Sequence, residues 1–233
     1  CHTINPRLFP EQLVFIINDA QDRVVLFDKT FLPLIRAVKA HTPTVEHFVY
    51  LGAFDQEVAD AVPDVKFYDV LIAEHSVQYE WPEFDENTAS SLCYTSGTTG
   101  NPKGALYSHR STVLHTYAIC LPDSLNLSAN DIMLPVVPMF HVNAWGTPYA
   151  AAMVGCTFVL PGPGLDGPSL VQMIDEYKVS IALGVPTIWQ GLLAAAKQTG
   201  STLVSLKRNV VGGSACPPAM MRAFRDIYNC ETI

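Results

Sequence analysis

The sequence predicts an α/β fold with mainly parallel sheets, and two observations lead to this fold class. Segments of helical periodicity alternate with short, β-branched segments along most of the 233 residues, and such alternation is typical of parallel sheets covered by helices. Hydrophobic residues make up 49% of the chain and charged residues only 15%, so a sizeable core can be buried on several faces. The length suits one large domain or two small ones.

The first part of the chain contains two predicted helix–strand units. Leu13, Ile16 and Ile17 recur at helical spacing and predict an amphipathic helix over residues 10–20. The segments that follow are a strand at 23–28, a helix at 31–40, a strand at 46–51 and a polar, acidic connection at 73–88.

The rest of the chain repeats the alternation after a hydrophobic strand at 89–93. Pro186 opens and Gly200 ends one of its helices, as is common at helix termini. The expected helices cover residues 108–121, 141–154, 170–177, 186–198 and 217–228, and the expected strands cover 131–137, 157–160, 180–185 and 209–212. A boundary between two αβ layers is expected near residues 105–130.

The most informative stretch runs from Tyr94 to Gly104. Its eleven residues include four aliphatic hydroxyl side chains, three glycines, one proline and one lysine. Glycines let the backbone turn with positive φ and approach a ligand, and the N–H groups of such a turn form an anion-binding concavity. We expect this loop between a strand and a helix start, where phosphate sites recur. The stretch therefore predicts a polyphosphate site.

Two other interpretations suit this loop less well. A Walker A loop requires Gly-Lys followed directly by Ser or Thr, whereas here Pro102 precedes Lys103 and Gly104 follows it. A plain flexible surface loop would also be rich in Ser, Thr and Gly. Such a loop does not require a Pro-Lys-Gly exit or a flanking strand and helix.

The stretch 94–104 resembles the signature loop of the adenylate-forming superfamily, which includes acyl-CoA synthetases, luciferases and peptide-synthetase adenylation domains. Residues 138–146, Pro-Met-Phe-His-Val-Asn-Ala-Trp-Gly, are similar to the acyl-site motif of its medium- and long-chain fatty-acyl-CoA synthetase branch. Residues 211–215, Val-Gly-Gly-Ser-Ala, resemble its adenine-binding turn, and residues 2–8 are a weaker match. The four motifs follow the family's order. The resemblance implies a layered αβαβα fold, like part of the large N-terminal domain of acyl-CoA synthetases.

The same resemblance implies roles for individual residues. Thr95 is expected to contact Mg²⁺, and Lys103 is expected to act in catalysis as a clamp on the phosphates. It is not the family's adenylating lysine, which belongs to a C-terminal domain absent from this chain. The residues expected to bind ATP are Thr95, Ser96, Gly97, Thr98, Thr99, Gly100 and Lys103 in the loop, and Gly212, Gly213, Ser214 and Ala215 in the adenine-binding turn.

The acyl-site motif carries the expected substrate residues His141, Trp145 and Gly146. By resemblance, His141 borders the acyl carboxylate and the AMP phosphate and takes part in catalysis, while Trp145 gates a fatty-acid tunnel. Their spacing of four predicts a shared helix face. The alternatives are a histidine inside the core, ordinary packing of Trp145, and a plain strand-to-helix turn at Gly212 and Gly213. The motif carries no carboxylate after Phe140, which argues against an amino-acid substrate.

Composition limits the other classes of protein. The net charge of −8 argues against nucleic-acid binding, which needs a basic face, but not against ATP. Six scattered cysteines without a CxxC pair favour reduced thiols and a cytoplasmic protein. The sequence contains no run of eighteen apolar residues, so it predicts no membrane span. Because the chain starts without Met inside a motif and ends after a predicted helix, we expect an internal fragment of the N-terminal AMP-binding domain.

The predicted activity of the full-length protein is ATP-dependent formation of an acyl-adenylate from a fatty or other carboxylic acid, followed by thioester formation with coenzyme A. ATP, Mg²⁺ and coenzyme A are the expected cofactors and co-substrates, and the fragment alone is expected to be inactive. The alternatives are a non-catalytic nucleotide-binding module and a luciferase-like or aryl-CoA ligase of the same superfamily. Small-molecule acids are the expected partners, and a homodimer of the full-length protein is left open.

Overall fold

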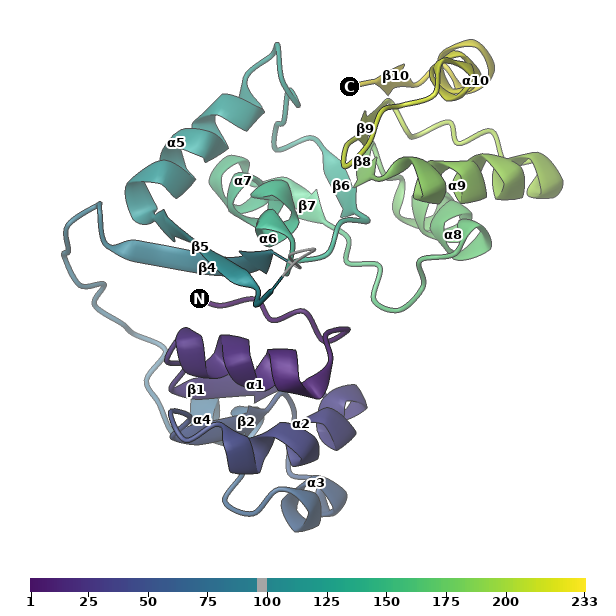
Figure 1. Ribbon diagram of the computed structural model, residues 1–233. Coiled ribbons are helices and arrows are strands. Elements are labelled where there is room, and N and C mark those ends of the chain that lie inside the picture. Colours follow the sequence, from purple (N-terminus) through teal and green to yellow (C-terminus); the bar gives the residue numbers. More distant parts are fainter. Residues whose placement is uncertain (96–99) are drawn as a thin grey trace. The chain divides into compact units, whose positions relative to one another are not determined.

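The chain folds into two compact units, Cys1–Ser108 and His109–Ile233. The computed structural model describes residues 1–95 and 100–233 (Figure 1). The division between the two units falls after Ser108. Each unit is described by itself.

The first unit is built on a parallel sheet with the strand order β1-β2-β3, in which Val25 pairs with Phe48. The strands are β1 (Val24–Phe27), β2 (His47–Tyr50) and β3 (Lys66–Phe67); the helices are α1 (Pro10–Asp19), α2 (Leu32–Val38), α3 (Gln56–Ala61) and α4 (Tyr68–Ala73), with 3-10 turns η1 (Lys29–Phe31) and η2 (Lys39–His41). Leu13, Ile16 and Ile17 of α1 are buried, which confirms the apolar face predicted for this helix.

A two-stranded antiparallel hairpin completes the first unit and corrects one expectation. Strand β4 (Ala89–Thr95) pairs with β5 (Lys103–Ser108), and helix α5 begins only at His109. The candidate phosphate loop therefore connects two strands, and the prediction that it leads into a helix is wrong. Residues 103–108 form a strand because β4 supplies backbone partners along their whole length, and the sequence alone does not reveal that pairing.

The second unit contains a five-stranded, wholly parallel sheet with the order β10-β9-β8-β6-β7. Its strands are β6 (Ile132–Pro135), β7 (Thr157–Phe158), β8 (Ile181–Gly184), β9 (Arg208–Val211) and β10 (Glu231–Thr232). Its helices are α5 (His109–Cys120), α6 (Val142–Trp145), α7 (Thr147–Val154), α8 (Gly167–Tyr177), α9 (Pro186–Thr199) and α10 (Pro218–Tyr228). The mainly parallel α/β class predicted from the sequence is confirmed.

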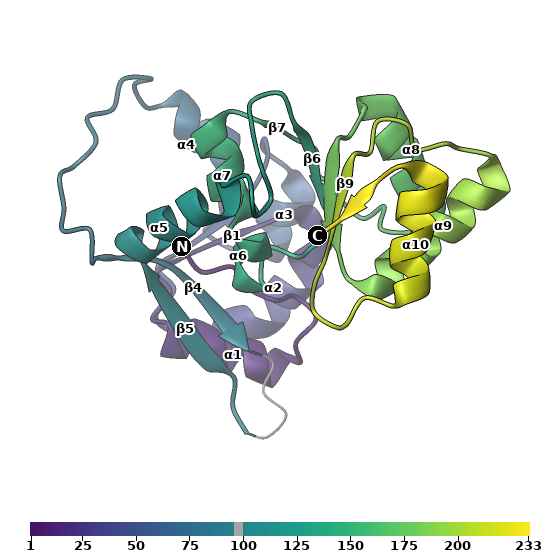
Figure 2. The same ribbon diagram turned by 90° about the horizontal axis from the view of Figure 1, so that it is seen from above.

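Helices cover both faces of this sheet. Figure 2 shows α8, α9 and α10 on one face and α5 and α7 on the other. Side chains of β8 alternate accordingly: Ala182 packs with the first group of helices, and Ile181 and Leu183 belong to the cluster on the opposite face. Burial on both faces explains why these strands are continuously apolar.

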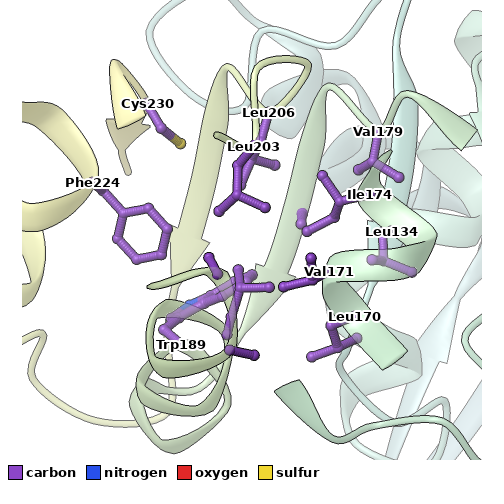
Figure 3. Packing of buried hydrophobic residues seen from close by; sticks show 14 of the residues in the cluster. Leu134, Leu170, Val171, Ile174, Val179, Trp189, Leu203, Leu206, Phe224 and Cys230 are labelled. Carbon is purple, nitrogen blue, oxygen red and sulfur yellow. The ribbon is translucent and has the colours of Figure 1, made fainter. Parts of the chain in front are cut away.

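The core on the α8–α10 side centres on Trp189 and Phe224 (Figure 3). Both side chains are fully buried, and their rings meet edge to face with centroids 5.9 Å apart. The indole N–H of Trp189 donates to the carbonyl of Val210 at 3.2 Å, so this buried polar group has a partner. The contact joins α9 to strand β9.

A buried ion pair fixes one end of the same sheet. Asp131, just before β6, accepts hydrogen bonds from Arg208 of β9 and, at 2.8 Å, from the Ser180 hydroxyl before β8. The backbone N–H of Ser128 donates to its other carboxylate oxygen at 2.9 Å. Burial acts to raise the pKa of Asp131, but these hydrogen bonds and the Arg208 charge outweigh it and hold the pKa below its ordinary value.

The six cysteines are all free thiols. Cys93, Cys156 and Cys230 are buried, and burial raises the pKa of Cys230 to about 12. Within residues 1–95 and 100–233, no helix is long and apolar enough to cross a membrane.

Candidate nucleotide and acyl site

The ends of the candidate phosphate loop are held by the hairpin of the first unit. Thr95 and Lys103 face each other as the last and first residues of β4 and β5. The Thr95 hydroxyl donates to the Lys103 carbonyl at 3.4 Å, and both residues are exposed. Gly100 has φ 88°, a left-handed conformation that favours glycine. Ser96, Gly97, Thr98 and Thr99 lie outside the described residues.

Tyr94 anchors this hairpin to helix α1. Its hydroxyl donates to the Asp19 carboxylate at 2.6 Å, and its ring lies 5.1 Å from that of His2. Burial and the Asp19 carboxylate both raise the pKa of Tyr94, so the phenol stays protonated and keeps donating. This hydrogen bond therefore joins the start of the candidate loop to helix α1.

Helix α6, which lies in the acyl-site motif of the second unit, is a single left-handed turn. Val142, Asn143, Ala144 and Trp145 have φ of 49°, 49°, 50° and 58°, and Gly146 follows with φ 73°. His141 is extended, at φ −112° and ψ 103°, and precedes the turn. The expected right-handed helix over 141–154 is therefore wrong in its first part, and so is the inference that His141 and Trp145 share its face. A right-handed helix begins only at Thr147.

The turn brings Trp145 against the candidate adenine-binding segment. A Cβ placed on Gly212 would lie 2.4 Å from Cη2 of the Trp145 indole, so only a glycine fits there. Gly212 also donates its N–H to the Gly184 carbonyl at 3.2 Å, and Gly213 has φ 79°. Two motifs that lie far apart in the sequence thus form one contact within the second unit.

The remaining candidate site residues differ in their solvent exposure. The His141 side chain is exposed, so the alternative of a histidine inside the core is wrong. Gly213, Ser214 and Ala215 are exposed beside the half-buried Gly212. Trp145 is half-buried and packs against the cluster on the α5–α7 side of the sheet. The exposed residues 213–215 therefore follow directly on the contact between Gly212 and the Trp145 ring.

Metal binding has little support from the side chains that the structure describes. Among the described residues, no group of three or more His, Cys, Asp or Glu side chains could hold a metal ion. The Thr95 hydroxyl is exposed and is an oxygen ligand of the kind Mg²⁺ prefers. It suits a metal that takes its remaining ligands from substrate phosphates and water.

Two contacts of the site could not be found from the sequence. The Tyr94–Asp19 hydrogen bond joins residues 75 positions apart. His115 of α5 lies with Nε2 3.2 Å from the carbonyl oxygen of Trp145, 30 positions further on. No motif or local period marks Asp19 or His115, and only the folded chain places them.

This combination of fold and motifs defines a nucleotide-binding class of enzyme. A family model described as AMP-binding enzyme matches residues 1–233, so the chain belongs to the family of AMP-binding enzymes.

Curated relatives are CoA ligases. A 3-methylmercaptopropionyl-CoA ligase of Ruegeria pomeroyi is 60% identical over 232 residues, which cover 100% of this chain and 43% of that protein. A medium-chain-fatty-acid–CoA ligase of Ectopseudomonas oleovorans is 60% identical over 233 residues, with the same coverage. The chain therefore spans less than half the length of these relatives.

Solved structures agree with the fold. The inhibitor-bound N-terminal domain of FACL13 from Mycobacterium tuberculosis superposes with a TM-score of 0.82 at 24% identity, covering 99% of this chain and 54% of that one. At that identity the likeness shows the fold alone. It confirms the predicted likeness to the N-terminal domains of adenylate-forming enzymes.

The contact between Trp145 and Gly212 leads to a stability prediction. Gly212→Ala places a methyl group where the indole lies, and overpacking of this kind costs about 1–3 kcal/mol. We expect the urea-unfolding free energy to fall by that amount. Gly191→Ala is the matched control, because a Cβ there lies 3.9 Å from its nearest neighbour. Equal stability of Gly212→Ala and the unmodified protein would show that Trp145 does not rest on Gly212.

Proposed function

We propose that the protein carrying this chain is an ATP-dependent acyl-CoA ligase. The contact of Trp145, in the acyl-site motif, with Gly212, in the adenine-binding motif, carries this proposal. A ligase of this class must bring an acyl group and the adenosine of ATP side by side. The CoA-ligase names of the two relatives that are 60% identical support the same reaction.

The proposed reaction has two steps. In the first, a carboxylate oxygen attacks the α-phosphorus of ATP, the bond to the bridging oxygen breaks, and pyrophosphate leaves. In the second, the thiol of coenzyme A attacks the acyl carbon, and the acyl–oxygen bond breaks to release AMP and a proton. A thioester forms, and no oxidant or reductant is required.

Residues of this chain would serve the first step mainly by electrostatics. Lys103 and the loop hydroxyls would offset the negative charge that moves onto pyrophosphate, the usual purpose of such donors. Mg²⁺ bound to the phosphates, with Thr95 as a protein ligand, would supply further positive charge. His141 is exposed beside the Trp145 turn and would orient the carboxylate.

The proposed substrate is a carboxylic acid with an apolar chain, such as a medium-chain fatty acid or a short thioether acid. The motif after Phe140 offers no carboxylate to pair with a substrate amine. Trp145 instead presents a half-buried apolar ring.

Oxygen labelling tests the reaction. The full-length protein is incubated with ATP, Mg²⁺, coenzyme A and octanoate carrying ¹⁸O in both carboxylate positions. We expect AMP to acquire one ¹⁸O atom from each carboxylate, because the carboxylate attacks the α-phosphorus. Label in inorganic phosphate would indicate an acyl-phosphate instead, and absence of product with every acid tried would favour a non-catalytic nucleotide-binding module.

A further inference from the structure

The left-handed turn at 142–146 needs outside support. Four successive non-glycine residues at φ 49–58° adopt a conformation that L-residues disfavour. Such strain persists only where the surroundings over-determine it, and it concentrates at functional positions. The turn closes on itself through Ala144 N–H to the His141 carbonyl at 3.1 Å and Gly146 N–H to the Val142 carbonyl at 3.2 Å. Helix α7 also contacts the turn, because the Asn143 amide donates to the Tyr149 hydroxyl at 3.2 Å and the Thr147 hydroxyl donates to the Ala144 carbonyl at 2.7 Å. Neither of these two bonds involves Trp145.

His115 joins Trp145 of the turn to helix α5 through a polar contact. Its Nε2 lies 3.2 Å from the carbonyl oxygen of Trp145. A carbonyl oxygen only accepts, so Nε2 must carry the proton and donate. Both the neutral Nε2–H tautomer and the imidazolium can do so, and the contact therefore does not depend on the charge of His115.

The His115 ring also makes a steric contact with Gly146. A Cβ placed on Gly146 would lie 2.7 Å from Cδ2 and 3.0 Å from Nε2 of His115. The imidazole thus occupies the space that any side chain at position 146 would take. Gly146 is required there twice, by its φ of 73° and by the closeness of His115.

Trp145 is therefore held from two sides. His115 contacts the backbone carbonyl of Trp145 and the following Gly146, and Gly212 packs against the edge of the Trp145 indole. We propose that His115 is a positioning residue, which fixes the backbone of the turn so that the Trp145 indole keeps its place in the acyl site. The expected effect on substrate binding rests on the proposed function, whereas the contact between His115 and Trp145 does not depend on it.

Fluorine NMR of the full-length protein labelled with 5-fluorotryptophan tests the contact without any activity. The resonance lost in Trp145→Phe identifies Trp145, and the resonance of the fully buried Trp189 reports an intact core. We expect His115→Ala to shift or broaden the Trp145 resonance and to leave that of Trp189 in place. His115→Gln should return the Trp145 resonance towards its original position, because the glutamine amide N–H can donate at similar reach. The exposed His75 supplies the control His75→Ala.

Kinetics test the consequence for substrate. We expect His115→Ala to raise the KM for octanoate about fivefold, as for one lost neutral hydrogen bond, with kcat within about twofold and substantial rescue by His115→Gln. An unmoved Trp145 resonance in His115→Ala would overturn the proposal, and so would a glutamine variant no better than alanine in both measurements. If the unmodified protein activates no acid, the proposed function fails, and the NMR measurement still decides the role of His115.

Discussion

Replacing Lys103 by alanine is expected to slow acyl-adenylate formation about 100-fold, the typical effect of losing one donor that stabilises developing charge. Lys103 opens strand β5, pairs with Thr95 across the hairpin and exposes its side chain. The strand fixes the backbone of the residue while leaving its ammonium group accessible to a phosphate. The measurement is the rate of carboxylate-dependent pyrophosphate exchange in the full-length protein at saturating acid.

The matched control is Lys197→Ala, which removes an exposed lysine from helix α9. It should leave the exchange rate unchanged, which would show that loss of one positive charge from the surface does not by itself slow the exchange. Urea unfolding should show that Lys103→Ala is as stable as the original protein. Exchange within about twofold of the original would exclude the phosphate-clamp role of Lys103.

Asp131→Asn is expected to produce the largest loss of stability, about 3 kcal/mol in the free energy of unfolding at pH 7. The substitution leaves Arg208 with an uncompensated charge, and the side chains of Arg208 and Asp131 are only 13% and 8% exposed. We place the loss at the lower end of the range for broken buried pairs, because Arg208 still donates to the Leu125 carbonyl at 2.6 Å. Urea denaturation followed by circular dichroism measures it.

Asp226→Asn is the control for this prediction. Asp226 pairs with Arg225 on the surface of α10, where the two side chains are 55% and 72% exposed. Solvent and salt screen such a pair, so its removal should change stability little. Similar losses for Asp226→Asn and Asp131→Asn would contradict the account of the buried pair.

The contribution of Asp131 also has a predicted pH dependence. Its pKa in the folded protein lies below its ordinary value, which is about 3.9 in an unfolded chain. Its stabilising effect is therefore fully present above about pH 4 and is lost as the pH falls through the lower folded value. The stability difference between Asp131→Asn and the original protein should stay constant from pH 7 to about 5 and shrink below about pH 4.

Much of the fold could be predicted because its signals are local. Apolar residues at helical spacing mark α1, and Pro186 and Gly200 mark the two ends of α9. Continuously apolar segments mark the central strands β6 and β8, which helices cover on both faces. In each case the residues that form the element also carry its pattern.

The incorrect predictions concern segments whose structure depends on residues that are distant in the sequence. Strand β5 exists because β4 pairs with it, and its own six residues start with Lys103 and Gly104, which are weak strand signals. The left-handed turn is contacted by His115 and Gly212, which lie 30 positions before and 67 positions after Trp145. A spacing of four between His141 and Trp145 therefore indicated a right-handed helix, whereas the folded chain forms a left-handed turn there.

The sequence predicted the motifs of the candidate site but not the contacts that join them to other elements. The motifs identified the family, and the fold brings two of them, at Trp145 and Gly212, into contact. The roles of Thr95, Lys103 and His141 stay predictions, since they depend on a bound nucleotide and acid. Bridging contacts such as Tyr94 with Asp19 carry no sequence motif, because a single carboxylate on a helix has many ordinary explanations.

Isotope exchange between pyrophosphate and ATP tests the central claim most directly. The full-length protein is incubated with ATP, Mg²⁺ and ³²P-labelled pyrophosphate, without coenzyme A, and with one acid at a time from a panel of short- to long-chain fatty acids, thioether acids and aryl acids. Reversible adenylation predicts that label enters ATP only when an accepted carboxylic acid is present, and that Lys103→Ala reduces this exchange. No acid-dependent exchange with any member of the panel would contradict the assignment as an acyl-adenylate-forming ligase.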